Sequence, residues 1–332
     1  MNTLIEQLQE TGIVDTHYHV GPEFFPRRYD VVTLAEAARQ AGMRLVLKNH
    51  ALATTALAAL ARRHMGAGLF GSVVLNQFVG GLNADAVHGA AAGNHAMVED
   101  PSQPEPPFVV WMPTVHAVSH LRCLGEPFDP RWWASCAAPV GLPDKSRPVV
   151  VFDEDLRPAP ELDAVLQAIA RCGARLATGH LHADEIMRLV PMALERGVAG
   201  ITITHPHYPS VRLSDQQLAI LTRDPRVFIE HCLAIHTIED VPLEAFADSI
   251  RVTGPEQVIL STDFGQIRSD PIPDGSYRLA REMSRRLGPR FGDSDVVRMM
   301  SVNPSRFLAL EARGPDRTQA HAHGDSPPAA PV

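Results

Sequence analysis

Short apolar runs that end in polar residues recur along this chain, and they constrain its fold more than any other feature. Most runs are rich in valine, isoleucine or leucine, and most follow a glycine or proline. Runs that are apolar on both faces suit a parallel sheet that is covered on both sides. The sequence predicts eight strands of this kind, at residues 12–17 (GIVDTH), 44–50 (RLVLKNH), 71–76 (GSVVLN), 108–114 (FVVWMPT), 175–180 (RLATGH), 200–205 (GITITH), 226–231 (RVFIEH) and 258–263 (VILSTD).

Amphipathic helical patterns lie between these runs. Apolar residues at helical spacing mark one face of residues 162–169 and of residues 186–194. Several of the helical segments close on a glycine, as in RQAG, ARCG, LERG and RVTG, which is the residue preferred just after a helix. Strands that alternate with helices predict an α/β protein, a (β/α)8 TIM barrel, with an open doubly wound sheet as the alternative fold.

Two long segments interrupt the alternation. Residues 80–107 and 115–147 follow predicted strands 3 and 4, and long loops of this kind usually cover a functional site. The barrel domain is expected to span residues 1–312. The Pro/Ala/His-rich end, residues 313–332, has no periodicity and is expected to be a disordered tail.

The composition argues against several classes of partner. The formal net charge is −8 and there is no long lysine or arginine run, so we expect neither nucleic acid nor a membrane surface as a partner. The four scattered cysteines without a CxxC pair predict reduced thiols. No segment has the pattern of a secretory signal or a membrane span. The sequence therefore predicts a cytoplasmic protein with a small-molecule substrate, and it leaves the oligomeric state open, a homo-oligomer included.

Polar residues stand at the C-terminal end of nearly every predicted strand. In a barrel these ends converge on one small area, where active sites lie. They are His17 and His19, Lys48 and His50, Asn76, Thr114, His180, His205, Glu230 and His231, and Asp263.

His17 and His19 are separated by one residue, so in an extended strand both side chains point to the same side and can bind one ion. Imidazoles with a carboxylate suit zinc and its neighbours, and an open position on such an ion would generate a nucleophilic hydroxide. Each signal alone has a structural alternative: a lone histidine can be a core or loop residue, and Asp263 can cap the following helix. Their joint order along the chain, with His180 and His205 between, favours a metal site.

This order of motifs resembles the amidohydrolase superfamily, metal-dependent hydrolases on a distorted (β/α)8 barrel. The resemblance covers nearly the whole folded length, from DTHYH through ATGH and THPH to STDFG and NPSRFL. The chain looks most similar to an amidohydrolase-related cytosolic group of unassigned activity. Phosphotriesterase-like and dihydroorotase-like members are more distant relatives by the same motif.

The resemblance implies roles for five residues. His17, His19 and Asp263 would bind a first divalent metal, with zinc as the expected ion. His180 and His205 would bind a second ion; with one ion, His180 would join the first set and His205 would orient the attacking water or polarise the substrate. Asp263 would take a proton from the water and deliver it to the leaving group.

The chain departs from the superfamily at strand 4. Two-metal members bridge their ions there with a carboxylated lysine or a glutamate, whereas VVWMPT offers neither. Lys48 is the strand-end lysine in an apolar setting, and burial would lower its pKa and free the amine for a carbamate that acts as a metal ligand. The alternative is a lysine that binds a negative substrate group or a loop carboxylate.

Other residues are candidates to bind the substrate or to support the site. Arg27 and Arg268 are candidates to clamp a substrate carboxylate. The tryptophans at 111, 132 and 133 are candidates for an aromatic wall, with Trp111 counted as substrate-binding. His50 and His231 are expected to support the site or cap a helix, and Tyr18 to pack.

The sequence thus predicts a metal-dependent hydrolase that cleaves an amide, lactam, imide, lactone or ester bond of a small organic substrate. Asp263, His205 and Lys48 are the candidate catalytic residues. A metal-dependent decarboxylase or lyase on the same barrel is the alternative enzyme. A non-catalytic ligand-binding barrel is the alternative outside enzymes.

Overall fold

The structure is a computed structural model and describes residues 3–95, 105–124 and 147–310. Its strands are β1 (Val14–His19), β2 (Arg44–Lys48), β3 (Gly68–Phe70), β4 (Ser72–Val74), β5 (Val109–Trp111), β6 (Arg175–Ala177), β7 (Ile201–Thr204), β8 (Val227–Cys232) and β9 (Val258–Ser261). Its α-helices are α1 (Leu4–Thr11), α2 (Val31–Gln40), α3 (Thr55–Met65), α4 (Ala84–His95), α5 (Val118–Leu124), α6 (Leu162–Arg171), α7 (Ala183–Glu195), α8 (Asp215–Leu221), α9 (Leu233–Glu239), α10 (Leu243–Thr253), α11 (Asp274–Leu287), α12 (Asp293–Val297) and α13 (Asn303–Leu308).

The strands form a parallel barrel made of two sheets. Strands β1, β2 and β3 pair in that order, and β4 to β9 pair in sequence order, all in parallel. Backbone hydrogen bonds from Asp263 to His17 (2.9 Å) and from His19 to Phe264 (2.7 Å) join the end of β9 to β1. The predicted (β/α)8 barrel is confirmed.

The predicted third strand is longer than expected and is divided in two. It begins at Gly68, and Gly71 separates β3 from β4. Gly71 lies so close to α3 that a Cβ atom there would be 2.2 Å from the Cα of Thr55. Only glycine permits this close approach. The pairing partner of the strand changes at Gly71, because β3 pairs with β2 and β4 pairs with β5.

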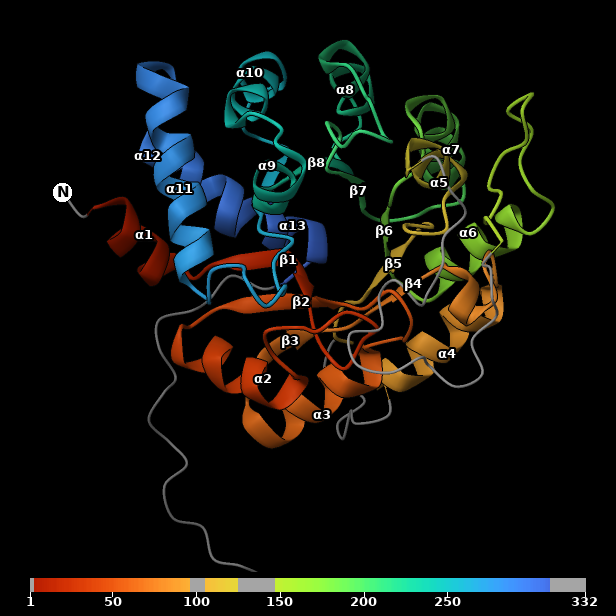
Figure 1. The fold of residues 1–332 in the computed structure, drawn as a ribbon, viewed down its shortest axis with the longest axis horizontal. Coiled ribbons are helices and arrows are strands. Elements are labelled where there is room, and N and C mark those ends of the chain that lie inside the picture. The colour runs from red at the N-terminus through yellow and green to blue at the C-terminus, as the bar shows by residue number, and fades with distance from the viewer. Residues whose placement is uncertain (1–2, 96–104, 125–146, 311–332) are drawn as a thin grey trace, which may run out of the picture.

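Helices surround the strands, as the apolar face of each amphipathic segment in the sequence predicted. In Figure 1, α2, α3 and α4 lie on one side of the barrel and α7, α8, α10 and α11 on the other. Leu162, Val165, Leu166 and Ile169 of α6 are fully buried. The glycines of RQAG, ARCG, LERG and RVTG all have positive φ, as a residue that ends a helix requires.

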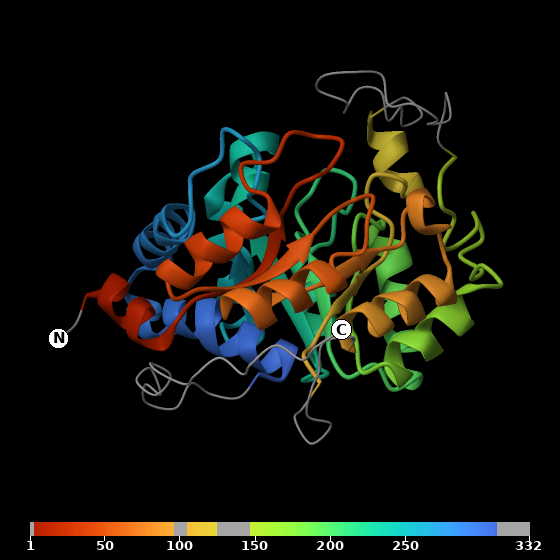
Figure 2. The same cartoon turned by 90° about the horizontal axis from the view of Figure 1, so that it is seen from below.

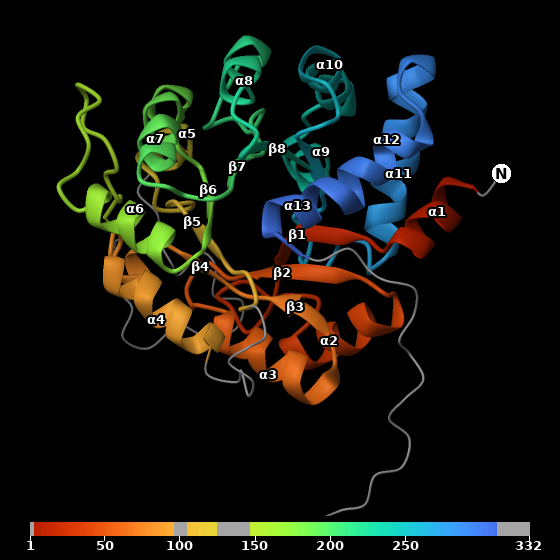
Figure 3. The same ribbon diagram turned by 180° about the vertical axis from the view of Figure 1, so that it is seen from behind.

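A smaller apolar cluster fills the barrel interior. It takes side chains from most of the strands, among them Val14, Val46, Val109 and Trp111, together with Phe307 of α13. Arg175 at the start of β6 donates a hydrogen bond to the Phe307 carbonyl. Helix α13 therefore covers the amino end of the strands, and it lies beside β1 in Figure 3. The opposite end is left for the site.

The N-terminal helix α1 packs against α11 and α12 from the C-terminal part of the chain (Figure 2). Helices α4 and α5 belong to the two long loops. Residues 96–104 and 125–146 of those loops, and the expected tail with its boundary at residue 312, lie outside the described residues. In the part of the chain that is described, no helix has the length and apolar character to cross a membrane.

Candidate metal centre

Three predicted metal ligands meet at the C-terminal ends of β1 and β9. Nε2 of His17 lies 2.9 Å, and Nε2 of His19 3.0 Å, from Oδ1 of Asp263. All three residues are buried. Together they are one of the groups of described residues whose donor atoms are close enough to hold a metal ion. The structure thus brings together the first ligand set that the resemblance implied.

Local backbone geometry places these side chains. The carboxylate of Asp15 accepts hydrogen bonds from the backbone N of His17 (3.0 Å) and from Oγ1 of Thr262 (2.5 Å), which ties β1 to the end of β9. Burial raises the pKa of Asp15 to about 6, although these hydrogen bonds favour the ionised form. Asp263 and His205 have left-handed backbones, with φ of 53° and 25°. Residues other than glycine seldom adopt such φ values, and those that do cluster at functional sites.

A buried carboxylate stands behind His17. Oε2 of Glu230 lies 3.1 Å from Nδ1 of His17, and Oε1 accepts a hydrogen bond of 2.5 Å from Oγ1 of Thr16. Burial acts to lower the pKa of His17, but the charges of Asp263 and Glu230 outweigh burial and raise it. Burial acts to raise the pKa of Glu230, but His17 and Thr16 lower it. Because Nδ1 is engaged by Glu230, Nε2 is the nitrogen that faces Asp263.

The donor set fits a divalent cation. Oδ1 of Asp263 makes no hydrogen bond with any described residue, although two imidazole nitrogens lie within 3.0 Å of it. Burial acts to raise the pKa of Asp263, but His17 and His19 hold it well below the ordinary value, so the carboxylate is ionised. Burial lowers the pKa of His19 well below 6.5, so its ring is neutral and offers a lone pair. Neutral imidazole and ionised carboxylate are the forms that bind zinc and similar metals.

Lys48 reaches the same centre from β2. Its Nζ lies 2.8 Å from Nε2 of His17 and 4.4 Å from the centre of the Trp111 ring. The residue is 1% exposed. Burial lowers the pKa of its amine, although the negative charges of Asp263 and Glu230 act to raise it. A lowered pKa increases the share of neutral amine, which is the form that reacts with carbon dioxide.

His180 and His205 lie beside the three-residue group. Their ring centres are 5.0 Å apart, and the ring of His205 is 5.9 Å from that of His17. Burial lowers the pKa of both histidines, that of His205 to about 3, so both are neutral. Nδ1 of His180 lies 3.0 Å from Nδ1 of His120, whereas Nδ1 of His205 has no hydrogen-bond partner among the described residues. The five predicted ligands therefore share one region, with two imidazoles at the edge of the central group.

A cavity of about 520 Å³ lies over these residues. Its lining includes Lys48, His19, His180, His205 and Asp263, and the two arginines expected to bind substrate, Arg27 and Arg268. A larger hollow of about 870 Å³, between α5, α7 and residues 148–156, is lined by none of the predicted site residues among those described.

The tryptophans do not form the expected wall in the described part of the chain. Trp111 is 1% exposed and belongs to the cluster inside the barrel, with its ring 4.4 Å from that of His17. It therefore packs against His17 rather than lining the cavity. Residues 132 and 133 lie outside the described residues.

The weaker candidates have mainly supporting contacts. His50 lines the cavity, and its ring lies 4.8 Å from that of His19. His231 stacks on His207 at 5.4 Å and is not among the described residues that line the cavity. Tyr18 is fully buried, as the alternation of β1 predicted.

Three residues of the site had no assigned role in the sequence. Glu230 was visible only as a strand end. Glu23, four residues after His19, has a fully buried side chain and pairs with Arg27, which the spacing from the HxH motif could have suggested. His120 contacts His180 from α5, and no local pattern marks it, because the contact depends on how the long loop after β5 folds back.

Known structures share the fold of this chain. Solved structures with a similar fold include an adenosine deaminase from Xanthomonas campestris with bound zinc, at 12% identity and a TM-score of 0.53 over 90% of this chain and 67% of that one. A mutant organophosphorus hydrolase from Deinococcus radiodurans matches at 12% identity and 0.51 over 90% and 94%. A dihydroorotase matches at 12% and 0.50 over 91% and 70%. At these identities the likeness shows the fold alone, an α/β barrel of parallel strands.

The chain belongs to the family described as "Family of unknown function (DUF6282)", whose model matches residues 12–230. The match includes His17, His19, Lys48, His180 and His205 and ends before Asp263. A comparison with curated proteins finds no match.

Proposed function

We propose that this protein is a metal-dependent hydrolase that cleaves an amide, lactam, imide, lactone or other ester bond of a small organic substrate. The proposal includes zinc as the ion, a carboxylate on the substrate and a cytoplasmic location. One observation supports it above all. The imidazole nitrogens of His17 and His19 lie within about 3 Å of the ionised carboxylate of Asp263, beneath a cavity.

Each residue of the centre has a proposed task. His17, His19 and Asp263 would hold one ion. His180 and His205 would hold a second, or, with one ion, His180 would complete the first set and His205 would orient the water. A bound divalent ion would supply polarisation of the scissile carbonyl and a water of lowered pKa.

Proton transfer is proposed for Asp263. Its carboxylate is kept ionised by His17 and His19, so it can accept the proton of the attacking water. The same group would then deliver the proton to the leaving nitrogen or oxygen. Glu230 would act through His17, by holding the ring with Nε2 toward the centre.

Two roles are proposed for Lys48, and one measurement separates them. As a carbamate it would become a metal ligand. As an ammonium it would bind a negative group of the substrate. With ¹³C-bicarbonate, a carbamate gives a carbonyl signal that disappears in the Lys48→Met variant, whereas an ammonium gives no such signal.

The test of the proposed function begins with metal analysis. We expect purified wild-type protein to carry a transition metal near stoichiometric amount, and a chelator to abolish hydrolysis. His17→Ala should lose the metal, while His64→Ala, an exposed histidine of α3, should keep it. A wild-type protein without a transition metal would overturn the proposal.

A decarboxylase or lyase is a second candidate, and the end of β5 favours it. Oγ1 of Thr114, the last residue of predicted strand 4, lies 3.0 Å from Nδ1 of His50 and accepts a 3.0 Å hydrogen bond from Asn76. That strand end therefore presents no carboxylate to bridge two ions, which suits the single ion expected of the lyase alternative. Release of carbon dioxide without incorporation of oxygen from ¹⁸O-water would identify this reaction. A metal-loaded protein that turns over no ester, amide or acid would instead point to a ligand-binding barrel.

A further inference from the structure

Some charged side chains of the cavity over the candidate metal centre form an ion pair within the described ranges, and others do not. Arg27 is already neutralised, because its Nε donates a 2.5 Å hydrogen bond to Glu23 and its Nη2 pairs with the same carboxylate oxygen. Both side chains of this pair are almost fully buried. Glu239 also lines the cavity, but it forms no ion pair with any residue of the described ranges. Within the described ranges, the cavity thus contains a carboxylate that no lysine, arginine or histidine side chain pairs with.

A tyrosine, Tyr208, lines the same cavity as Glu239. Tyr208 favours the ionised form of Glu239 and so acts to lower the pKa of that carboxyl, although burial raises it. Burial raises the pKa of Tyr208, with nearby carboxylates adding to the effect, so the hydroxyl keeps its proton. The Tyr208 ring packs 4.8 Å from His180 and 4.9 Å from His205, which places this pair next to the metal centre.

The position of Glu239 is unfavourable for a carboxylate in the free protein. It is the last residue of α9, where the helix dipole disfavours negative charge. Half-burial raises its pKa, and the charges of Asp263 and Asp240 raise it further. A cation from outside the protein would relieve each of these costs.

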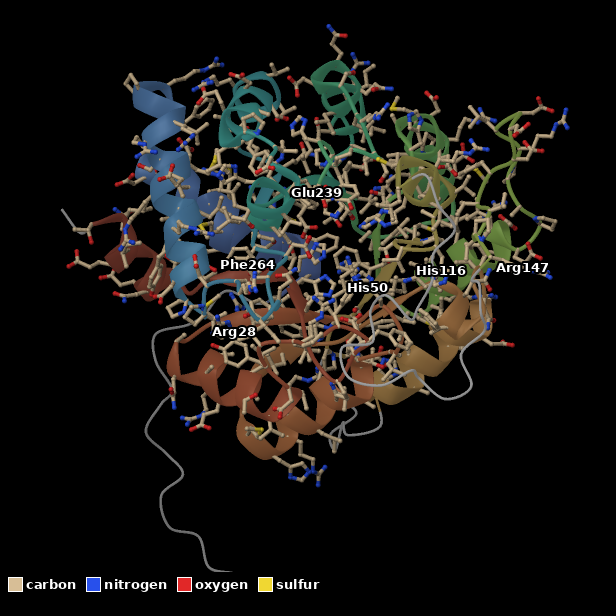
Figure 4. The ribbon with its side chains drawn as sticks, viewed as in Figure 1. Arg28, His50, His116, Arg147, Glu239 and Phe264 are labelled. Atoms are coloured by element: carbon tan, nitrogen blue, oxygen red, sulfur yellow. The ribbon has the colours of Figure 1, made fainter. Side chains whose placement is uncertain are left out.

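The space beside Glu239 is apolar. Ala234, Ile235 and Ile238 of α9 line the cavity on the same helix, and Ile267 lines it from the loop after β9. Figure 4 shows Glu239 on the α9 side, well separated from Arg28 of the loop after β1. An occupant that fits these surfaces combines an apolar body with a positively charged end.

We propose that Glu239, which lines the cavity together with Tyr208, is the subsite for an ammonium or amidinium group of the substrate. This inference rests on the proposed function and narrows it to amides or esters that carry a basic nitrogen. Together with Arg268 at the rim, which forms no ion pair in the described ranges, the cavity then suits zwitterionic, amino-acid-like substrates.

Binding of two small probes tests the subsite. Benzylamine and benzyl alcohol have the same apolar body and differ in the charged end. Their affinities would be measured near neutral pH by calorimetry, on full-length wild type, Glu239→Gln and Asp240→Asn. Asp240→Asn is the matched control: it removes a carboxylate from the adjacent residue, which is exposed, and asparagine tolerates the left-handed backbone found there.

We expect the wild type to bind benzylamine at least about tenfold more tightly than benzyl alcohol, as one hydrogen-bonded charge pair provides. Glu239→Gln should lose this preference and keep its affinity for the alcohol, with an unchanged melting temperature. Asp240→Asn should retain the preference. Equal binding of the two probes by the wild type, undetectable binding of benzylamine, or an unchanged preference in Glu239→Gln would each overturn the subsite.

The same titrations on metal-loaded and chelator-treated protein separate this inference from the proposed function. Glu239 is not one of the proposed ligands, so the preference for the amine should persist after chelation. Loss of metal binding with an intact preference would refute the hydrolase and leave the subsite standing. A stoichiometric metal without the preference would refute the subsite alone.

Discussion

Replacing Glu230 by glutamine tests how the protein prepares His17 to bind a metal ion. The amide preserves the size of the side chain and an oxygen that can accept a hydrogen bond from Nδ1, but it removes a negative charge 3.1 Å from the ring. Two full charges at that distance would interact by about 5 kcal/mol at an effective dielectric constant of about 20, which is an upper bound for a ring that carries part of a charge. Carboxylates that support a metal-bound histidine typically contribute about 10- to 100-fold to affinity. We therefore expect the Kd for zinc to rise about 10- to 100-fold, or about 1.4–2.7 kcal/mol.

The assay is competition with a chromogenic chelator. Glu256→Gln, the same substitution at an exposed position before β9, is the control and should bind zinc like the wild type. Because Asp263 and Glu230 raise the pKa of His17, a proton competes with the ion, and wild-type affinity should fall as the pH drops below neutrality. A Kd for Glu230→Gln within about twofold of the control would refute the role given to this carboxylate.

Two further predictions concern buried groups. Lys48→Met keeps the buried aliphatic volume and removes the amine that lies 2.8 Å from Nε2 of His17. We therefore expect the rate of hydrolysis to fall by about a hundredfold or more, with an unchanged circular dichroism spectrum. A rate near that of the wild type would exclude Lys48 from the chemistry. Burial, with a contribution from His120, lowers the pKa of His116 from 6.5 to about 4. The pKa of His116 is therefore lower in the folded state than in the unfolded state. Its contribution to the free energy of unfolding is fully present above pH 6.5 and is lost as the pH falls toward 4. The difference between the two pKa values corresponds to about 3 kcal/mol. Urea unfolding with chelator present should show a smaller acid-induced loss for His116→Gln than for the wild type, and equal losses would contradict the assignment.

The strands and the grouping of His17, His19 and Asp263 were predictable because their signals are local. An apolar run that ends in a polar residue places that residue at the end of a parallel strand, and the barrel brings such ends together. The spacing of His17 and His19 determines that both side chains point to one side. The division of the third strand was less accessible, since Gly71 matters only through its contact with Thr55 of α3.

The surroundings of the centre were harder to predict, because they depend on contacts between distant segments. Trp111 was expected in the wall, but it follows Val109 on the inward-facing side of β5, and strand alternation places both inside the barrel. The pairing of Glu23 with Arg27 changes the expected clamp, since a neutralised guanidinium offers less attraction to a substrate carboxylate. The contact of His120 with His180 requires the path of the loop after β5, which no pattern in the sequence reveals.

The proposed function depends on His17, His19 and Asp263 binding the same cation. Anomalous diffraction from crystals of the purified protein, recorded at the absorption edge of the metal it carries, would locate that cation. We expect a peak about 2.0–2.2 Å from Nε2 of His17, Nε2 of His19 and an oxygen of Asp263. A fully loaded crystal whose peaks all lie away from these three atoms would contradict it.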